Sequence, residues 1–221
     1  MHQWKPLIWV EGIIGCGKTT LSRKVGELLG LRVIEEPVDS NPYLKPFYND
    51  PKKYAFPMQI FLLHRRYAMQ QLASYEASPA SSYNGAILDR SLSGDRVFAK
   101  LHTEAGNITD LDWKTYEEAY MIMCRSLLPP TLLVYIDAQP KTAHERMKNR
   151  NRSAEVGVPL DYLIKLREGY KDLIAEAESG LLPWSHAVRV VRIPWDPDTL
   201  TEDQWSHTAA TIEDSCRGLL R

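Results

Sequence analysis

The chain has 221 residues, of which 44% are hydrophobic and 25% charged, which is sufficient for one well-packed core. Lys and Arg total 27 against 28 for Asp and Glu, with both signs interspersed, so the sequence shows no basic stripe for nucleic acid or a membrane surface. We therefore expect a single domain, residues 1–221, whose partner is a small molecule.

Three cysteines, Cys16, Cys124 and Cys216, lie far apart and show no CxxC spacing. An odd number of isolated thiols favours a reducing compartment over a disulfide framework. No apolar run approaches the roughly 18 residues of a membrane span, and the first residues lack the pattern of a signal or transit peptide. The sequence predicts a cytoplasmic protein whose partners include neither nucleic acid nor a membrane.

Short apolar segments alternate with segments of helical periodicity. The expected strands are 7–10, 32–35, 86–88, 132–136 and 188–193. The expected helices are about 18–29, 52–75, 92–104, 111–127, 140–150, 159–178 and 200–218, with loops at 37–51, 76–84 and 150–158. This alternation predicts an α/β fold with a five-stranded parallel sheet flanked by helices, and ligands then bind at the carboxyl ends of the strands.

The first expected strand leads directly into a match to the phosphate-loop pattern GxxxxGK[ST], followed by a helix. In this pattern backbone N–H groups surround a phosphate, the lysine reaches the β- and γ-phosphate oxygens, and the hydroxyl binds Mg²⁺. We expect ATP to be bound by Gly12, Ile13, Ile14, Gly15, Cys16, Gly17, Lys18, Thr19 and Thr20. The alternatives are a glycine-rich turn with a solvated lysine and, for Cys16, a nucleophilic role.

Charged residues follow the second and third expected strands. Phosphoryl transfer to an alcohol needs a group that takes the hydroxyl proton, so Glu36 is the candidate general base. Asp89 offers a carboxylate for Mg²⁺ or its waters, and Arg90 a guanidinium for phosphate oxygens or for holding Glu36. The alternatives are a surface turn at Glu36 and a buried structural ion pair at Asp89 and Arg90.

Four basic residues crowd the end of the helix expected at 140–150 and the loop after it: Arg146, Lys148, Arg150 and Arg152. A run of charges is commonly a solvated helix face. Because residues 154–157 after it suit a mobile segment, we expect instead a lid at about 146–158. Such a lid closes over the transferring phosphates and supplies Arg146, Arg150 and Arg152 to the developing charge.

Five segments in order resemble the deoxyribonucleoside kinases, the family that includes the deoxycytidine, deoxyguanosine and deoxyadenosine kinases. They are the phosphate loop, 36–38, 48–59, 89–91 and 150–160. The resemblance implies a P-loop kinase fold with an arginine-bearing lid. It also implies transfer of the ATP γ-phosphoryl group to the 5′-hydroxyl of a deoxynucleoside, with Mg²⁺, by a homodimer.

The same resemblance implies roles for single residues. Glu36 would be the base on the 5′-hydroxyl and Arg90 its partner. Tyr48 and Glu155 would hold the sugar 3′-hydroxyl, since a phenol and a carboxylate together can donate to and accept from one hydroxyl. Gln59 would bind the nucleobase through its amide. The alternatives are a tyrosine at the edge of the core, a solvated loop glutamate and a solvent-facing glutamine.

Arg66, two helical turns beyond Gln59, and Asp95 match a charged pair in family members that accept deoxycytidine or purine deoxynucleosides. Asp95 can accept from an exocyclic amino group and Arg66 can donate to a ring nitrogen or carbonyl, whereas a thymine methyl gains from neither. Animal members of the family usually carry Glu at the position of Asp89, so in this feature the sequence resembles the bacterial branch of deoxyadenosine and deoxyguanosine kinases. We therefore expect a purine substrate or deoxycytidine; the alternative is that Arg66 and Asp95 are exposed helix charges.

Two other functions stay open. A nucleoside monophosphate kinase of the thymidylate kinase type shares the phosphate loop and the lid, but needs further basic groups for its acceptor phosphate, which the carboxylate of Glu36 would repel. A non-catalytic nucleotide-binding subunit is the second alternative. The presence of Lys18, Glu36, Arg90 and the lid arginines argues against it.

Overall fold

The computed structural model describes residues 5–35, 41–150, 157–195 and 202–217. One parallel sheet has the strand order β2-β3-β1-β4-β5. The strands are β1 (Leu7–Glu11), β2 (Arg32–Ile34), β3 (Ala86–Asp89), β4 (Leu132–Asp137) and β5 (Arg189–Pro194). The predicted five-stranded parallel sheet is confirmed, and each strand end lies within one residue of its expected position.

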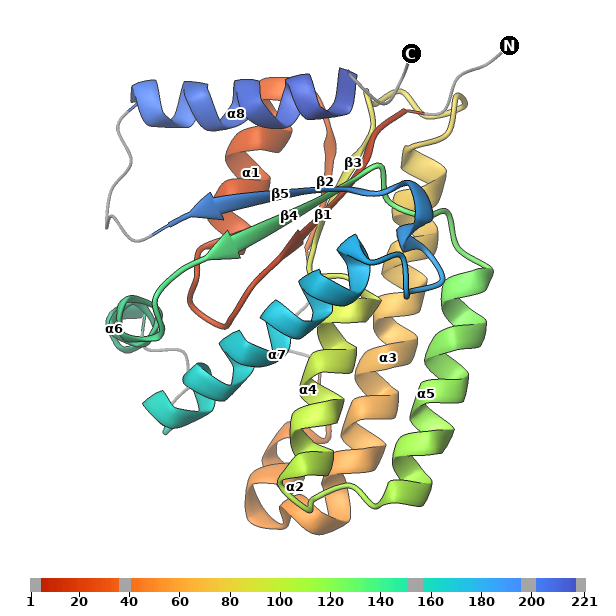
Figure 1. The fold of residues 1–221 in the computed structure, drawn as a ribbon, viewed down its shortest axis with the longest axis vertical. Helices are drawn as coiled ribbons and strands as arrows, with labels where there is room; N and C mark the ends of the chain where they lie inside the picture. The colour runs from red at the N-terminus through yellow and green to blue at the C-terminus, as the bar shows by residue number, and fades with distance from the viewer. Residues whose placement is uncertain (1–4, 36–40, 151–156, 196–201, 218–221) are drawn as a thin grey trace.

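Helices cover both faces of this sheet, as predicted (Figure 1). They are α1 (Lys18–Leu29), α2 (Leu44–Asn49), α3 (Pro51–Glu76), α4 (Leu92–Glu104), α5 (Asp110–Arg125), α6 (Pro140–Arg150), α7 (Leu160–Glu178) and α8 (Glu202–Arg217), with a 3-10 turn at Ser185–Ala187. Helices α1 and α8 lie on one face, and α3, α4 and α7 lie on the other, with α5 packed outside α3 and α4. Helix α6 lies beyond the carboxyl ends of β4 and β5.

The centre of the sheet is apolar because both of its faces are covered. All five residues of β1 are buried, and Trp9 at its middle packs edge-on against Trp184 with ring centroids 4.7 Å apart. The carboxyl ends of β1 and β3 lie side by side, since Val10 pairs with Asp89. The residues that follow these two strands therefore meet at one edge of the sheet.

Helix α2 corrects one expectation, because residues 44–49 were predicted to be part of a loop. Its one proline, Pro46, lies in the first turn, where the missing N–H is tolerated. The ring of Phe47 packs edge-on against His102 of α4, with centroids 5.0 Å apart. A helix of six residues is not stable alone, so contacts of this kind with distant helices decide whether it forms.

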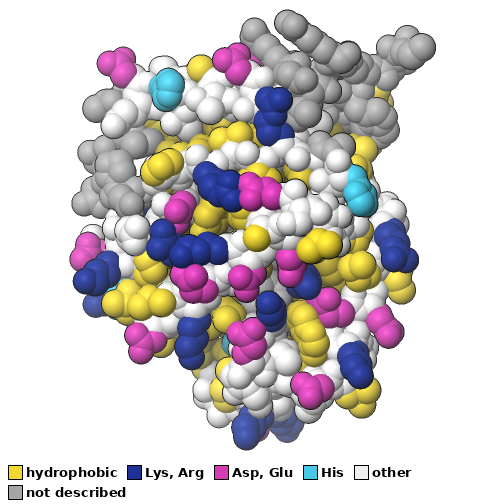
Figure 2. All heavy atoms as spheres, viewed as in Figure 1, with side chains coloured by type: hydrophobic (Ala, Val, Ile, Leu, Met, Phe, Trp, Pro, Cys, Tyr) yellow, Lys and Arg dark blue, Asp and Glu magenta, His cyan; other side chains and the backbone are white. Residues whose placement is uncertain are grey.

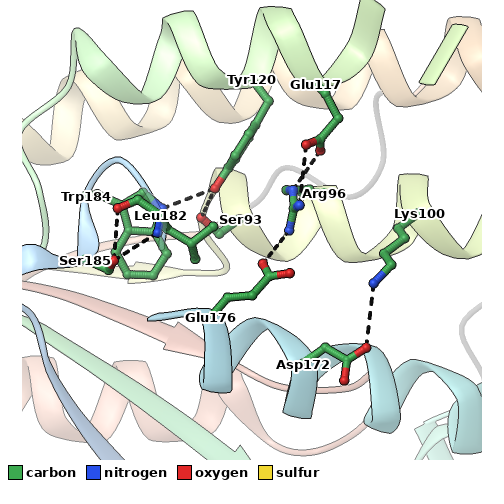
Figure 3. Close-up of polar contacts among 10 residues, drawn as sticks. All are labelled: Ser93, Arg96, Lys100, Glu117, Tyr120, Asp172, Glu176, Leu182, Trp184 and Ser185. Carbon is green, nitrogen blue, oxygen red and sulfur yellow. Dashed lines mark hydrogen bonds and ion pairs between the residues drawn. The ribbon is translucent and has the colours of Figure 1, made fainter. Parts of the chain in front are cut away.

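Helix α4 is held in place by ionic contacts on the side away from α3 (Figure 3). Arg96 donates to Glu117 of α5 at 2.7 Å and to Glu176 of α7 at 2.8 Å. The preceding residue, Asp95, contacts α3 instead. Contacts with α3, α5 and α7 thus fix the position of α4 and of the side chains that it presents to the carboxyl edge of the sheet.

The surface of the face drawn in Figure 2 carries Lys and Arg side chains interspersed with Asp and Glu. This agrees with the near balance of charges in the sequence. Within the described ranges, no helix is long and apolar enough to cross a membrane.

Candidate active site

A cavity of about 1060 Å³ lies at the carboxyl ends of β1 and β3. Its walls include Lys18 and Thr19 from the phosphate loop, Gln59 and Arg66 from α3, and Asp95 from α4. Pockets for one small ligand typically measure about 300–1,000 Å³, so this cavity has room for an acceptor and the phosphates of a donor together. Sequence positions far apart in the chain are therefore brought to one site.

The phosphate loop has the backbone that its glycines allow. Gly17 has a φ of 105°, and an added Cβ would lie 2.5 Å from Nε1 of Trp195, so both conformation and space require glycine here. Lys18, the first residue of α1, donates through Nζ to the carbonyl oxygens of Gly12 (3.0 Å) and Ile13 (2.9 Å). The pKa of Lys18 lies below its usual value because the side chain is buried, and the charge of nearby acidic groups, including Asp89, offsets part of this effect.

The two residues expected to bind Mg²⁺ lie together. Thr19 Oγ1 donates to Asp89 Oδ2 at 2.5 Å, which joins the start of α1 to the end of β3. Among the described residues no group of three or more His, Cys, Asp or Glu side chains could hold a metal ion. A hydroxyl beside one carboxylate nevertheless fits Mg²⁺, which prefers oxygen ligands and usually keeps several waters and substrate phosphates.

Arg90 lies in the turn after β3 with a φ of 70°, the one positive φ of a non-glycine residue in the described part of the chain. Such conformations are uncommon and gather at functional sites. Its guanidinium lies over the ring of Phe98, 4.5 Å from the centroid, and donates to the hydroxyl of Tyr170 at 3.0 Å. Arg90 and Asp89 thus make different contacts, as two residues with separate tasks would.

The pocket between α3 and α4 is polar and almost completely buried. Arg66 and Asp95 are 2% and 3% exposed and form an ion pair, and Arg66 also donates to the carbonyl oxygen of Asp89 at 3.4 Å. Gln59 is 1% exposed, and its Oε1 has no hydrogen-bond partner among the described residues. The alternatives of exposed helix charges and a solvent-facing glutamine are therefore wrong.

Other expected residues lie at the rim of the cavity. Tyr48 of α2 lines the cavity and is 51% exposed. Thr20 in the first turn of α1 and Arg150 at the end of α6 also line the cavity. Arg146 instead donates to the carbonyl oxygens of Cys16 (3.4 Å) and Trp195 (2.9 Å), which fastens α6 to the phosphate loop.

Three expected site residues, Glu36, Arg152 and Glu155, lie outside the described residues. Their roles remain predictions from the sequence.

Sequence reasoning missed three residues of the site. Glu11 and Trp195 do not line the cavity but lie against its walls, and both end or follow a strand at the carboxyl edge of the sheet, a position that could have marked them. His102 carries no such signal. It lines the cavity in contact with the ring of Phe47, and burial lowers its pKa to about 4.

A central strand that leads into a phosphate loop, an all-parallel sheet covered on both faces and a large polar cavity beside that loop define the class. The protein has the P-loop kinase fold.

Comparison with known proteins gives the family within this class. The family model for deoxynucleoside kinase matches residues 8–213. Deoxyadenosine kinase of Dictyostelium discoideum is 36% identical over 88% of this chain and 76% of its own length, and deoxyguanosine kinase of the same organism is 37% identical over 84% and 66%. A structure of deoxyadenosine kinase from M. mycoides with bound dCTP is 26% identical and covers 94% of this chain and 98% of its own, with a TM-score of 0.75.

The chain therefore belongs to the deoxynucleoside kinase family. It is an ATP-dependent phosphotransferase that acts on deoxynucleosides.

Proposed function

We propose that the protein transfers the γ-phosphoryl group of ATP to the 5′-hydroxyl of a purine deoxynucleoside or deoxycytidine. The observation that carries this preference is the buried polar pocket formed by Gln59, Arg66 and Asp95. Two of the similar proteins, named deoxyadenosine kinase and deoxyguanosine kinase, support it, as does the deoxyadenosine kinase structure with bound dCTP. A thymidine kinase of Ictalurid herpesvirus 1, 33% identical, favours the opposite preference.

The chemistry of the pocket suits a base with several polar edges. Gln59 offers a buried amide oxygen that needs a donor, such as an exocyclic amino group. Arg66, on the same helix as Gln59, adds donors, and Asp95 of α4 adds an acceptor. A buried polar group left unpaired costs about 1–3 kcal/mol, so a base that satisfies fewer of these groups binds more weakly. Thymine, which has a carbonyl group where cytosine has an amino group and an apolar methyl group at C5, is such a base.

The reaction roles follow the chemistry of each side chain. Glu36 takes the proton of the 5′-hydroxyl, and Arg90 stabilises charge on the transferred phosphoryl group. Lys18 binds the β- and γ-phosphates. When the lid closes, Arg150 and Arg152 add their positive charges around the transferred phosphoryl group. Thr19 and Asp89 would hold Mg²⁺ together with ATP, and the ion would supply positive charge to the phosphates.

Tyr48 and Glu155 hold the 3′-hydroxyl of the sugar in this proposal. Tyr48 lines the cavity and is 51% exposed, which supports this role. We also propose that the protein is cytoplasmic, as its isolated thiols indicate, and a homodimer, as the family resemblance implies.

The test is an assay of purified protein with ATP and Mg²⁺ against the four deoxynucleosides and their four monophosphates, following both ADP and the phosphorylated product. We expect 5′-monophosphates of deoxyadenosine, deoxyguanosine or deoxycytidine as the main products, with Lys18→Ala as the inactive control. A preference for thymidine would show that Arg66 and Asp95 do not select the base. Turnover of a monophosphate in preference to every nucleoside would replace the proposal with a monophosphate kinase.

A further inference from the structure

Glu11 is a buried carboxylate beside the reaction site with no part in the roles described so far. It is the last residue of β1, directly before Gly12 of the phosphate loop, and its side chain has no exposed surface. An acidic group is rarely buried completely unless it has strong partners. The contacts of its two oxygens therefore show what it does.

One oxygen of Glu11 holds the turn after β3. Oε1 accepts from the backbone N–H of Ser91 at 2.7 Å and from the hydroxyl of Ser91 at 2.5 Å. The carbonyl oxygen of Val10 accepts from the N–H of Arg90 at 3.0 Å. The end of β1 thus accepts hydrogen bonds from two successive residues of the turn, Arg90 and Ser91, whose N–H groups flank the left-handed backbone of Arg90.

The other oxygen of Glu11 faces the start of α4. Oε2 is buried and has no hydrogen-bond partner in the described part of the chain. A Cβ on Gly94 would collide with Oε2 and would lie 2.8 Å from Cγ of Arg90, so glycine at this position leaves room for both side chains. Burial raises the pKa of Glu11, while the charges of Arg90 and Lys18 lower it. Glu11, Gly94 and Arg90 are therefore packed as one unit.

We infer that Glu11 is a positioning residue of the phosphoryl transfer, which holds the guanidinium of Arg90 at the reaction site by fixing the turn through Ser91. Left-handed backbone is unfavourable for arginine, and it persists only where the surrounding contacts determine it. The hydrogen bonds from Ser91 to Glu11 provide such contacts. The inference rests on the proposed role of Arg90 in stabilising the transferred phosphoryl group.

The experiment compares two variants that disturb the turn without touching substrate, Ser91→Ala and Gly94→Ala, with Ser93→Ala as the matched control. Ser93 is a buried serine of the same helix whose hydroxyl pairs with Tyr120, away from the cavity (Figure 3). We expect Ser91→Ala and Gly94→Ala to lower kcat about tenfold, with KM for nucleoside and ATP within about twofold, because a small displacement of a catalytic group costs turnover. Ser93→Ala is expected to change Tm but not kcat.

Substitution of Glu11 itself provides a rescue test. In Glu11→Gln the amide oxygen can still accept from both donors of Ser91, whereas Glu11→Leu cannot. We expect Gln to retain at least a third of kcat and Leu to lose most of it. If Glu11→Leu does not fold, the Ser91 and Gly94 variants still decide the question.

A double-mutant cycle separates this inference from the role of Arg90 on which it rests. If Glu11 acts through Arg90, then Ser91→Ala has no further effect on kcat once Arg90→Ala has been made. If the fold-losses in kcat of Ser91→Ala and Arg90→Ala multiply in the double variant, the inference is overturned and the role of Arg90 stands. The same holds if kcat is unchanged in both Ser91→Ala and Gly94→Ala. An Arg90→Ala variant with normal kcat overturns both.

Discussion

Arg66 and Asp95 form an ion pair with two contacts, Nε to Oδ2 at 3.1 Å and Nη2 to Oδ1 at 3.3 Å, and both side chains are almost completely buried. Removal of one member leaves the other charged and desolvated, at a cost of about 3–5 kcal/mol, whereas removal of both leaves no stranded charge. The pair therefore has to be changed together or not at all.

The first prediction follows from this pairing. Arg66→Met with Asp95→Ala is expected to shift the ratio of kcat/KM toward thymidine by about 10- to 100-fold, since an apolar pocket accepts the 5-methyl group. Each single variant should be less stable and less active than the double variant. Steady-state kinetics with four deoxynucleosides and urea unfolding measure both effects.

A control for this prediction is available on the same helix. Arg96→Met with Glu117→Ala removes an ion pair of similar chemistry that lies outside the cavity. It should lower stability without changing the order of substrates. A change of base preference in the control, or none in the Arg66 and Asp95 double variant, would contradict the prediction.

The second prediction concerns the general base. Glu36→Gln keeps the shape of the side chain but removes the proton acceptor, so kcat should fall by about 10² or more while nucleoside binding is retained. Glu35→Gln is the matched control, because the carboxylate of Glu35 is already engaged by Arg23 at 2.5 and 2.6 Å. Near-normal turnover of Glu36→Gln in a single-turnover assay would remove Glu36 from the mechanism.

The third prediction concerns lid closure. In the proposed mechanism phosphate charge drives closure, so ATP or a bisubstrate analogue should protect the segment from limited proteolysis, and Arg150→Ala or Arg152→Ala should abolish the protection and lower kcat by about 10². Lys148→Ala, at an exposed position of the same helix, should behave like the unmodified protein. Equal protection with and without nucleotide would mean that this segment is a fixed helix end.

The fourth prediction uses the buried His102, whose ring contacts those of Phe47 and Tyr162. Burial lowers its pKa to about 4 in the folded protein, against about 6.5 in the unfolded chain. Below pH 6.5 His102 takes up a proton in the unfolded chain but not in the folded protein. The free energy of unfolding therefore decreases as the pH falls toward 4. At pH 5 the loss is about 2 kcal/mol relative to pH 7.

Urea unfolding at pH 7 and pH 5 measures this difference. His102→Phe keeps an aromatic ring without a titrating group, so the loss of stability between the two pH values should be smaller by about 2 kcal/mol than in the unmodified protein. His207→Gln, at an exposed position of α8, is the control and should leave the difference unchanged. An identical pH dependence for His102→Phe and the unmodified protein would show that His102 is not buried in solution.

The sequence by itself determined the sheet and the phosphate loop. Strands that are buried on both faces are continuous apolar segments, which a pattern of residues reveals directly. The phosphate loop is equally local, since one short segment contains the glycines and Lys18 together. The family resemblance added the base pocket, for which periodicity could show only that Gln59 and Arg66 share a face of one helix.

Only the tertiary structure decided which polar residues are buried and what they contact. Arg66 and Asp95 are 29 positions apart, and Glu11 and Ser91 are 80 apart, so neither contact has a local signature. Helix α2 likewise forms where a loop was expected, because Phe47 packs on α4 and Tyr43, the residue before the helix, packs on α3. The physical reason is that burial depends on how distant helices pack against the sheet, whereas periodicity reports only which residues share a face of their own element.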